Sequence, residues 1–190
     1  SDWSYWGRPL PGFGDPDAKL LIIGLAPAAH GGNRTGRMFT GNSSGDWLIK
    51  VLYETGFSNQ AISISRDDGL KLTSAYITAT VRCAPPGNKP TIKEIENCSQ
   101  YLLEEIQLLK EVEVVLALGR ISFDTYIKYM CPRNYKPKPH FQHGMFYSLK
   151  GMPTVAASYH PSRQNTQTGK LTWDMWLHVF KEIRCLLERR

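Results

Sequence analysis

Several side chains that could contact a ligand lie in one long loop that follows an apolar run at residues 20–23. The loop is rich in glycine and contains His30, Arg34, Arg37 and Phe39, which could supply an imidazole, two cations and a stacking ring. An unbroken apolar run is typical of a buried parallel strand, and open α/β sheets bind ligands beyond the carboxyl ends of such strands. The glycines fit neither GxGxxG nor GxxxxGK[ST], so nothing indicates a dinucleotide or an NTP. A crossover loop with purely structural glycines would look similar.

Two more loops with chemically capable residues follow apolar runs later in the chain. One reads VRCAPPGNKPT and contains Asn88, and the other reads SYHPSRQNTQTGK and contains His160. Prolines and glycines keep the first of these loops out of regular structure. Because parallel strands bring their carboxyl ends to one edge of a sheet, we expect the three loops to converge there.

The distribution of charge indicates a polyanionic partner. The net charge is +6, and no Asp or Glu occurs in residues 18–45, 69–93 or 125–173. These acid-free segments include the loops expected at the ligand-binding edge, where a polyanion would meet little repulsion. A chance distribution on a mildly basic protein is the alternative, but three such segments on one face favour nucleic acid.

Apolar runs alternate with amphipathic segments along the chain, which predicts strands alternating with helices. We expect one three-layer α/β/α domain over residues 1–190, with a mainly parallel four-stranded sheet and an extended arm at residues 1–18. A capping box at Thr91 and Glu94 marks one helix start. The predicted strands are 20–23, 75–81, 113–118 and 154–158, and the predicted helices are 46–55, 91–109, 121–130 and 172–187.

Membrane insertion and a disulfide framework are not indicated. No apolar run approaches the roughly 20 residues that span a bilayer, and no signal peptide is visible, so we expect a cytoplasmic protein. The cysteines are widely spaced without a CxxC pair, which favours reduced thiols or partial metal ligands over disulfides. They are Cys83, Cys98, Cys131 and Cys185.

Long motifs in the three loops resemble the uracil-DNA glycosylase superfamily. The motifs GLAPAAHGGNRTGR and YHPSRQNTQTG, together with YWGRPLPGFGDP near the start, most resemble family 5, the broad-specificity iron–sulfur enzymes of archaea and bacteria. The resemblance extends from Tyr5 to the last helix and implies the same fold as the alternating pattern. It also implies that the protein flips a deaminated base out of double-stranded DNA and hydrolyses its N-glycosidic bond.

The chemistry of that reaction explains the residue types in the loops. The base leaves with negative charge on an oxygen while the sugar becomes cation-like, so the enzyme needs hydrogen-bond donors at the base and a group that orients water. By resemblance, Phe39 would stack on the flipped base, His160 would donate to the base oxygen, and Asn88 would contribute to the pocket. A core aromatic, a structural histidine and a turn asparagine are the respective alternatives.

The resemblance assigns further roles to the backbone and to surface residues. The pocket wall would be formed by small residues that allow close approach of the base, namely Gly24, Leu25, Ala26, Pro27 and Ala28. The loop that enters the DNA would include Arg163, Gln164 and Asn165. The candidate phosphate contacts are Arg34, Arg37 and Lys89, for which plain solvated charge is the alternative.

The sequence departs from the family at Asn42, where the family has an aspartate. A carboxylate can polarise water and oppose positive charge on the sugar, whereas an amide supplies neither basicity nor charge. Asn42 is either a natural variant or a substitution made to trap a complex. Asp46 is nearby, but it reads as a first-turn residue of the following helix rather than as a replacement.

A second departure concerns the 4Fe–4S cluster of the family. Cys83 and Cys98 match one pair of its four cysteine ligands, while the other pair lies before the YW motif in the family and has no counterpart in this sequence. We therefore expect a cluster only if two further cysteines complete the set.

Three functions remain open from the sequence. The leading hypothesis is a monomeric DNA glycosylase that acts on uracil, with hypoxanthine and xanthine as further candidate substrates. A non-catalytic binder of damaged DNA on the same fold is kept open by Asn42. A glycosidase of free nucleosides is weaker, because it needs neither a basic face nor a DNA-penetrating loop.

Overall fold

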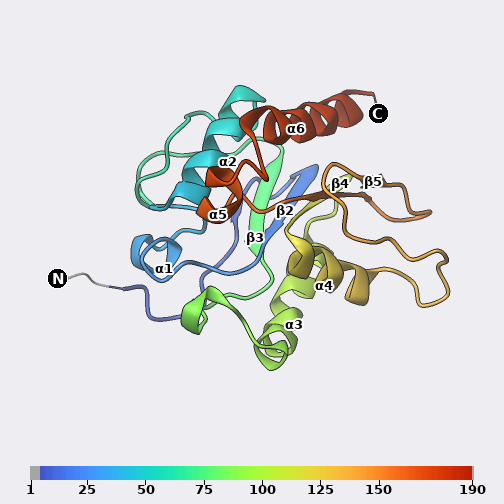
Figure 1. The fold of residues 1–190 in the computed structure, drawn as a ribbon, viewed down its shortest axis with the longest axis horizontal. Helices are drawn as coiled ribbons and strands as arrows, with labels where there is room; N and C mark the ends of the chain where they lie inside the picture. Colours follow the sequence, from blue (N-terminus) through green and yellow to red (C-terminus); the bar gives the residue numbers. More distant parts are fainter. Residues whose placement is uncertain (1–4, 190) are drawn as a thin grey trace.

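The computed structural model describes residues 5–189, and a parallel sheet lies at its centre (Figure 1). Its four inner strands are β2 (Leu20–Gly24), β3 (Ala75–Ala79), β4 (Val114–Leu118) and β6 (Thr154–Ser158), in the spatial order β3-β2-β4-β6. Nearly all their side chains are buried, as expected for strands covered on both faces. The four strands predicted from the sequence are confirmed.

Two short antiparallel strands extend this sheet, which therefore has six strands where the sequence predicted four. β1 (Phe13–Gly14) pairs with β3 at one edge, and β5 (Phe146–Tyr147) pairs with β6 at the other. Each strand has only two residues, which is too short for a repeating pattern in the sequence. The predicted extended arm and the basic segment between α4 and β6 therefore supply the edges of the sheet.

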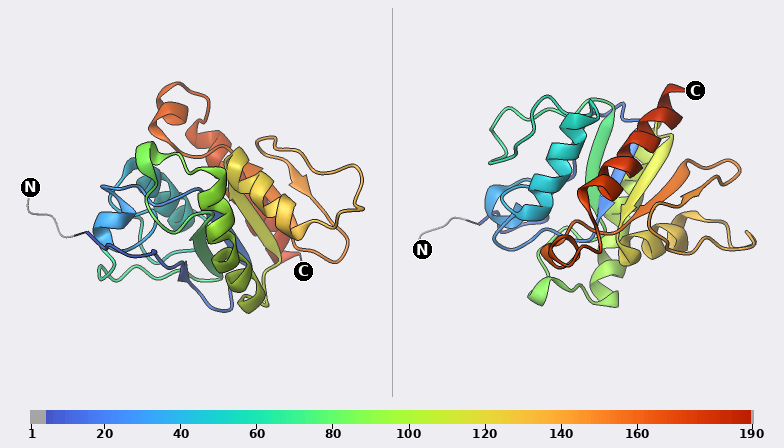
Figure 2. Two further views of the ribbon diagram at one scale, coloured as in Figure 1. Left: turned by 90° about the horizontal axis from the view of Figure 1, so that it is seen from below. Right: turned by 45° about the horizontal axis from the view of Figure 1, so that its top comes forward.

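Helices cover both faces of the sheet and give the predicted three layers (Figure 2). α2 (Ser43–Glu54) and α6 (Trp173–Glu188) pack on one face, and α3 (Ile92–Leu108) and α4 (Arg120–Met130) pack on the other. Alternate residues of β2 enter the two cores: Leu20 and Ile22 enter the first, and Leu21 and Ile23 the second. Among residues 5–189, no helix is long and apolar enough to cross a membrane.

Three short helical segments occupy the loops at the carboxyl edge of the sheet. They are α1 (Gly32–Thr35), η1 (Pro86–Asn88) and α5 (Arg163–Gln167). We predicted irregular loops at these places, because segments of three to five residues contain no full period of a helix. The loops after β2, β3 and β6 thus converge at one edge, as predicted.

Helix α3 is fixed to the sheet by a partly buried carboxylate. Glu105 accepts hydrogen bonds from the Thr78 hydroxyl at 2.5 Å and the Tyr76 hydroxyl at 3.2 Å, and its Oε2 lies 2.5 Å from Nη2 of Arg82. Arg82 also donates to the carbonyl of Leu10, which holds the amino-terminal arm against the same place. These polar contacts fix the loop after β3 relative to α3.

A second buried ion pair holds the segment between α2 and β3. Nη2 of Arg37 lies 2.7 Å from Asp68 and 2.6 Å from the Ser63 hydroxyl, and the Ser63 and Thr40 hydroxyls are 2.6 Å apart. Arg37 is only 6% exposed. The prediction that Arg37 contacts a DNA phosphate is therefore wrong, because its guanidinium is committed to this internal network.

We expect Arg37→Ala to lower the free energy of unfolding by about 3–5 kcal/mol, because the change leaves the partly buried carboxylate of Asp68 without its cation. Lys128→Ala removes an exposed pair with Glu96 and should cost less than about 1 kcal/mol. Urea denaturation of both variants measures the difference. Equal losses would show that the buried network adds no stability.

The same pair should make stability depend on acid. Partial desolvation of Asp68 acts to raise its pKa, but the ion pair with Arg37 and backbone N–H donors prevail and lower the pKa to about 2. This stabilisation is complete above the ordinary carboxyl pKa of about 4, and it is lost as the pH falls from about 4 towards 2. Denaturation of Asp68→Asn should show a correspondingly weaker dependence on pH in that range.

Candidate active site

A cavity of about 670 Å³ opens at the carboxyl edge of the sheet, where the three loops meet. The loop after β2 supplies most of its wall, and the first turn of α2, the end of β3, η1 and the loop after β6 supply the rest. Nine residues that sequence analysis assigned to the site line this cavity: Leu25, Ala26, Pro27, Ala28, Phe39, Asn42, Asn88, His160 and Arg163. The structure thus brings together residues that are up to 138 positions apart in the chain.

Phe39 is held in the cavity by two close approaches of the backbone. A Cβ atom at Gly24 would lie 2.7 Å from Cε2 of Phe39, so Gly24 forms the floor beneath the ring. A Cβ at Gly45 would collide with the carbonyl of Phe39. Phe39 itself has a φ of 51°, a conformation that an L-residue adopts only when its surroundings enforce it. Its ring is therefore oriented by the fold before any ligand binds.

The imidazole of His160 faces Phe39 across the cavity. The two ring centroids are 5.9 Å apart with a 30° angle between the planes. His160 lies two residues after the end of β6, and its carbonyl accepts a hydrogen bond of 2.8 Å from Nδ2 of Asn165. Asn165 is therefore a positioning residue for His160, although sequence analysis placed it among the DNA contacts.

Burial lowers the pKa of His160 to about 4, because the charged form of the ring is poorly solvated in this position. The ring is accordingly neutral at neutral pH. A neutral imidazole carries one N–H donor, so His160 can donate to an oxygen without bringing a positive charge into the cavity. That is the property needed at an atom where negative charge develops during a reaction.

We expect His160→Ala to lower the single-turnover rate on a uracil-containing duplex by roughly 10²-fold or more, the usual effect of losing one such donor. The rate of the unmodified protein should show no titration step near pH 6.5, because His160 protonates only near pH 4. Rates measured from pH 5 to pH 8, with thermal melting as a folding control, check both points. An unchanged rate in the folded variant would show that His160 is structural.

Asn42 combines a place in the cavity wall with a structural role. It is the N-cap of α2, and its Oδ1 accepts a hydrogen bond of 2.8 Å from the backbone N–H of Gly45. A Cβ at Gly31 would collide with the Asn42 amide, so the side chain is confined from both sides. Asp46 lies in the first turn of α2, as predicted, and is not among the residues that line the cavity.

Asn88 combines a place in the cavity wall with a turn conformation. It lines the cavity, and it has a φ of 56° directly after Gly87, whose φ is 61°. Asparagine tolerates this left-handed conformation better than most residues. Both the pocket role and the turn role that we weighed for Asn88 are therefore compatible with its position.

The candidate DNA contacts differ in their exposure. Arg163, Gln164 and Lys89 are exposed around the cavity. Arg34 is half-buried, and its Nε donates to the carbonyl of His30 at 2.9 Å. Arg34 is therefore partly committed to shaping the loop, in addition to any contact with a ligand.

Sequence analysis noted His30 without giving it a role, yet His30 lines the cavity. The hydroxyl of Tyr5 lies 2.8 Å from Nδ1 of His30, which fixes the ring at the cavity rim. Ser44 and Ser162 also line the cavity and were not singled out. In the sequence, their cavity position was indicated only by their closeness to Asn42 and His160.

Cys83 and Cys98 lie close enough to interact electrostatically, which is compatible with shared ligation of a metal group. Burial raises the pKa of Cys83, and the nearby Cys98 raises it further. Glu105 of α3 pairs with Arg82, so the ion pair between them helps hold the segment before Cys83 against the helix that carries Cys98. Within residues 5–189, however, no three potential ligands form a group, so the described chain offers two thiolates where a 4Fe–4S cluster needs four.

Comparison with known proteins identifies the family. Residues 11–184 match the model of the uracil DNA glycosylase superfamily. The type-5 uracil-DNA glycosylase of Thermus thermophilus is 50% identical over 96% of this chain and 82% of its own length. The type-5 proteins of Pyrobaculum aerophilum and Mycobacterium tuberculosis are 46% and 44% identical over 94% and 98% of this chain, and 76% and 69% of their own lengths.

The chain belongs to the type-5 uracil-DNA glycosylases. A type-4 uracil-DNA glycosylase of Pyrobaculum aerophilum is more distant, at 32% identity over 66% of this chain. The family resemblance inferred from the three loops is thus confirmed, and nothing in the comparisons supports a non-catalytic binder. In this glycosylase, the loops that carry the family motifs are the same loops that enclose the cavity.

Proposed function

We propose that this protein removes uracil from double-stranded DNA by hydrolysing the N-glycosidic bond, leaving an abasic site. The observation that carries the proposal is the placement of an aromatic ring and a neutral imidazole across one cavity, in Phe39 and His160. Phe39 stacks on the flipped base, and His160 donates to the base oxygen that gains negative charge as the bond breaks.

Exposed residues around the cavity support duplex DNA as the substrate. Arg163 lines the opening, and Gln164 and Lys89 are exposed beside it. Extruding a base requires unstacking it, and side chains at the cavity opening can fill the space that the base leaves. We assign the α5 loop to this role and Lys89 to a phosphate contact.

Gel analysis of strand breaks after alkali treatment tests the proposed activity directly. A uracil-containing duplex and free deoxyuridine are incubated in parallel with the protein. Cleavage of the duplex alone is expected. Binding without cleavage would favour a damage-binding protein, and release of uracil from the nucleoside would favour a nucleoside glycosidase.

Asn42 is the residue that limits hydrolysis in this proposal. Its amide can hydrogen-bond a water but has no negative charge to oppose the growing positive charge on the sugar. Aspartate is an equally good N-cap, so Asn42→Asp can preserve the bond to Gly45 while it introduces a carboxylate.

We expect Asn42→Asp to raise the single-turnover rate by an order of magnitude or more, with little change in affinity for the duplex. Affinity and rate are measured on the same uracil-containing DNA. Asn42→Ser retains an N-capping side chain without the charge, so it controls for effects on α2. Equal rates for Asn42→Asp and the unmodified protein would assign activation of the water to another group.

We further propose hypoxanthine and xanthine as additional substrates. The cavity of about 670 Å³ is wide enough for a purine, and its wall from Leu25 to Ala28 consists of small and apolar residues that impose few polar demands. Duplexes that differ only in the damaged base, compared by single-turnover rate, rank the three substrates.

We also propose that Cys83 and Cys98 supply two of four thiolates of a 4Fe–4S cluster, with two further cysteines completing the set. Their proximity supports this assignment. A bound cluster would hold the loop after β3 against α3 without taking part in bond cleavage. Iron and sulfide analysis of Cys83→Ser and Cys98→Ser in the protein as isolated tests the assignment.

A further inference from the structure

A row of paired cations and aromatic rings lies next to His160 and includes a ring from the segment that precedes β5. It consists of Arg120, Phe141, Tyr159 and Lys170, which we call the cationic ledge. Arg120 begins α4, Phe141 precedes β5, Tyr159 follows β6, and Lys170 lies between α5 and α6. None of these residues was assigned a role above.

Each cation of the ledge lies over a ring. Nζ of Lys170 is 4.8 Å from the ring centroid of Tyr159, and Cζ of Arg120 is 5.5 Å from that of Phe141. The two rings are themselves 6.0 Å apart. Lys170 and Arg120 are both exposed, so their charges face solvent while the rings restrict where they lie.

Tyr159 is itself fixed by His143. The two rings are parallel within 5° at a centroid distance of 4.8 Å, and Nδ1 of His143 accepts a hydrogen bond of 3.1 Å from the Tyr159 backbone. A separation of 4.8 Å leaves no room for an ammonium, so Lys170 covers the other side of the Tyr159 ring. Tyr159 therefore has no free face for a base and serves to orient the lysine.

The ledge is continuous with the active site. Tyr159 is the residue before His160, and Arg120 follows Gly119, where an added Cβ would lie 3.6 Å from Cβ of His160. DNA that places a nucleotide in the cavity must therefore pass close to the ledge if it extends towards β5.

The charge of the ledge is largely uncompensated. No acid occurs between residues 125 and 173. Asp124 interacts electrostatically with Arg120 from the next turn of α4, and Asp174 lies four residues beyond Lys170. In the part of the chain that the structure describes, neither Lys170 nor Arg120 forms an ion pair.

We propose that the cationic ledge binds backbone phosphates of the DNA strand on one side of the flipped nucleotide. This inference rests on the proposed function for the position of the DNA. Because the rings orient the cations and Tyr159 presents no free face, the ledge contacts phosphates without reading base sequence. The ledge adds phosphate contacts to the DNA on one flank of the flipped nucleotide and does not contact the reacting atoms in the cavity.

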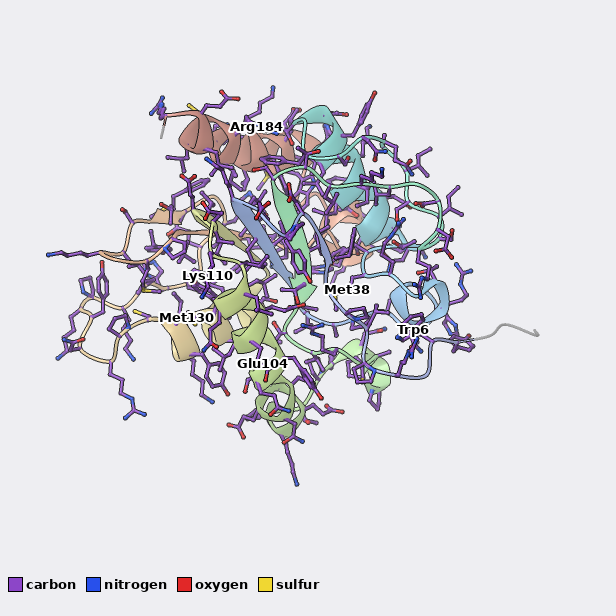
Figure 3. The ribbon with its side chains drawn as sticks, turned by 180° about the vertical axis from the view of Figure 1, so that it is seen from behind. Trp6, Met38, Glu104, Lys110, Met130 and Arg184 are labelled. Atoms are coloured by element: carbon purple, nitrogen blue, oxygen red, sulfur yellow. The ribbon has the colours of Figure 1, made fainter. Side chains whose placement is uncertain are left out.

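The test compares Lys170→Ala with Lys110→Ala. Lys110 is an exposed lysine that precedes β4 (Figure 3). It therefore lies towards the amino-terminal ends of the parallel strands, whereas the cavity lies at their carboxyl ends. Affinity for an undamaged duplex and for a uracil-containing duplex is measured over a range of salt concentrations. Each lost phosphate contact should reduce the slope of log affinity against log salt by about 0.9.

We expect Lys170→Ala to reduce this slope by about one and to weaken binding several-fold. Lys110→Ala should leave the slope unchanged, and Lys170→Arg should restore it. Equal slopes for Lys170→Ala and the unmodified protein, or equal losses in both alanine variants, would overturn the proposal.

Duplexes shortened on one side of the uracil locate the contact. The penalty of Lys170→Ala should disappear when one flank is removed and persist when the other is removed. A penalty that persists whichever flank is removed would overturn the proposal. Failure of the unmodified protein to release uracil would contradict the proposed function alone, since the salt slopes on undamaged DNA still test the ledge.

Discussion

The absence of a side chain at Gly24 and Gly45 is the steric constraint on which the active site depends. Because Gly24 has no side chain, the ring of Phe39 can pack against the end of β2. Because Gly45 has none, the carbonyl of Phe39 can lie against the first turn of α2. The loop between them is then fixed on its outer side by the network of Arg37, Thr40 and Ser63. The ring of Phe39 is therefore positioned by backbone packing and buried hydrogen bonds, so little ordering of this ring remains when a ligand binds.

Several parts of this arrangement could be predicted from the sequence. The four inner strands appear as apolar runs because both faces of the sheet are covered, and the capping box at Thr91 marks the start of α3. Placing the three loops at one edge followed from the parallel order of the strands alone. The roles of Phe39, His160 and Asn88 required the family resemblance, because a single aromatic, imidazole or amide in a loop has no distinctive pattern.

Other features depend on tertiary contacts that no local pattern records. In the sequence, Arg37 is equally compatible with an exposed position and with an internal ion pair. Its burial is determined by Asp68, which is distant in the chain and becomes its partner only in the folded structure. Asn165 contacts the carbonyl of His160 instead of facing solvent with its neighbours Arg163 and Gln164. The edge strands β1 and β5 arise because the exposed backbone groups of β3 and β6 recruit nearby chain, whatever its side chains.

The hydrogen bond from Asn165 to the backbone carbonyl of His160 joins α5 to the residue that faces Phe39 across the cavity. α5 is also the segment that we propose to enter the DNA, so a displacement of this segment would be transmitted to the backbone of His160 through one side chain. If α5 enters the DNA as proposed, its insertion and the placement of His160 are coupled through this single hydrogen bond.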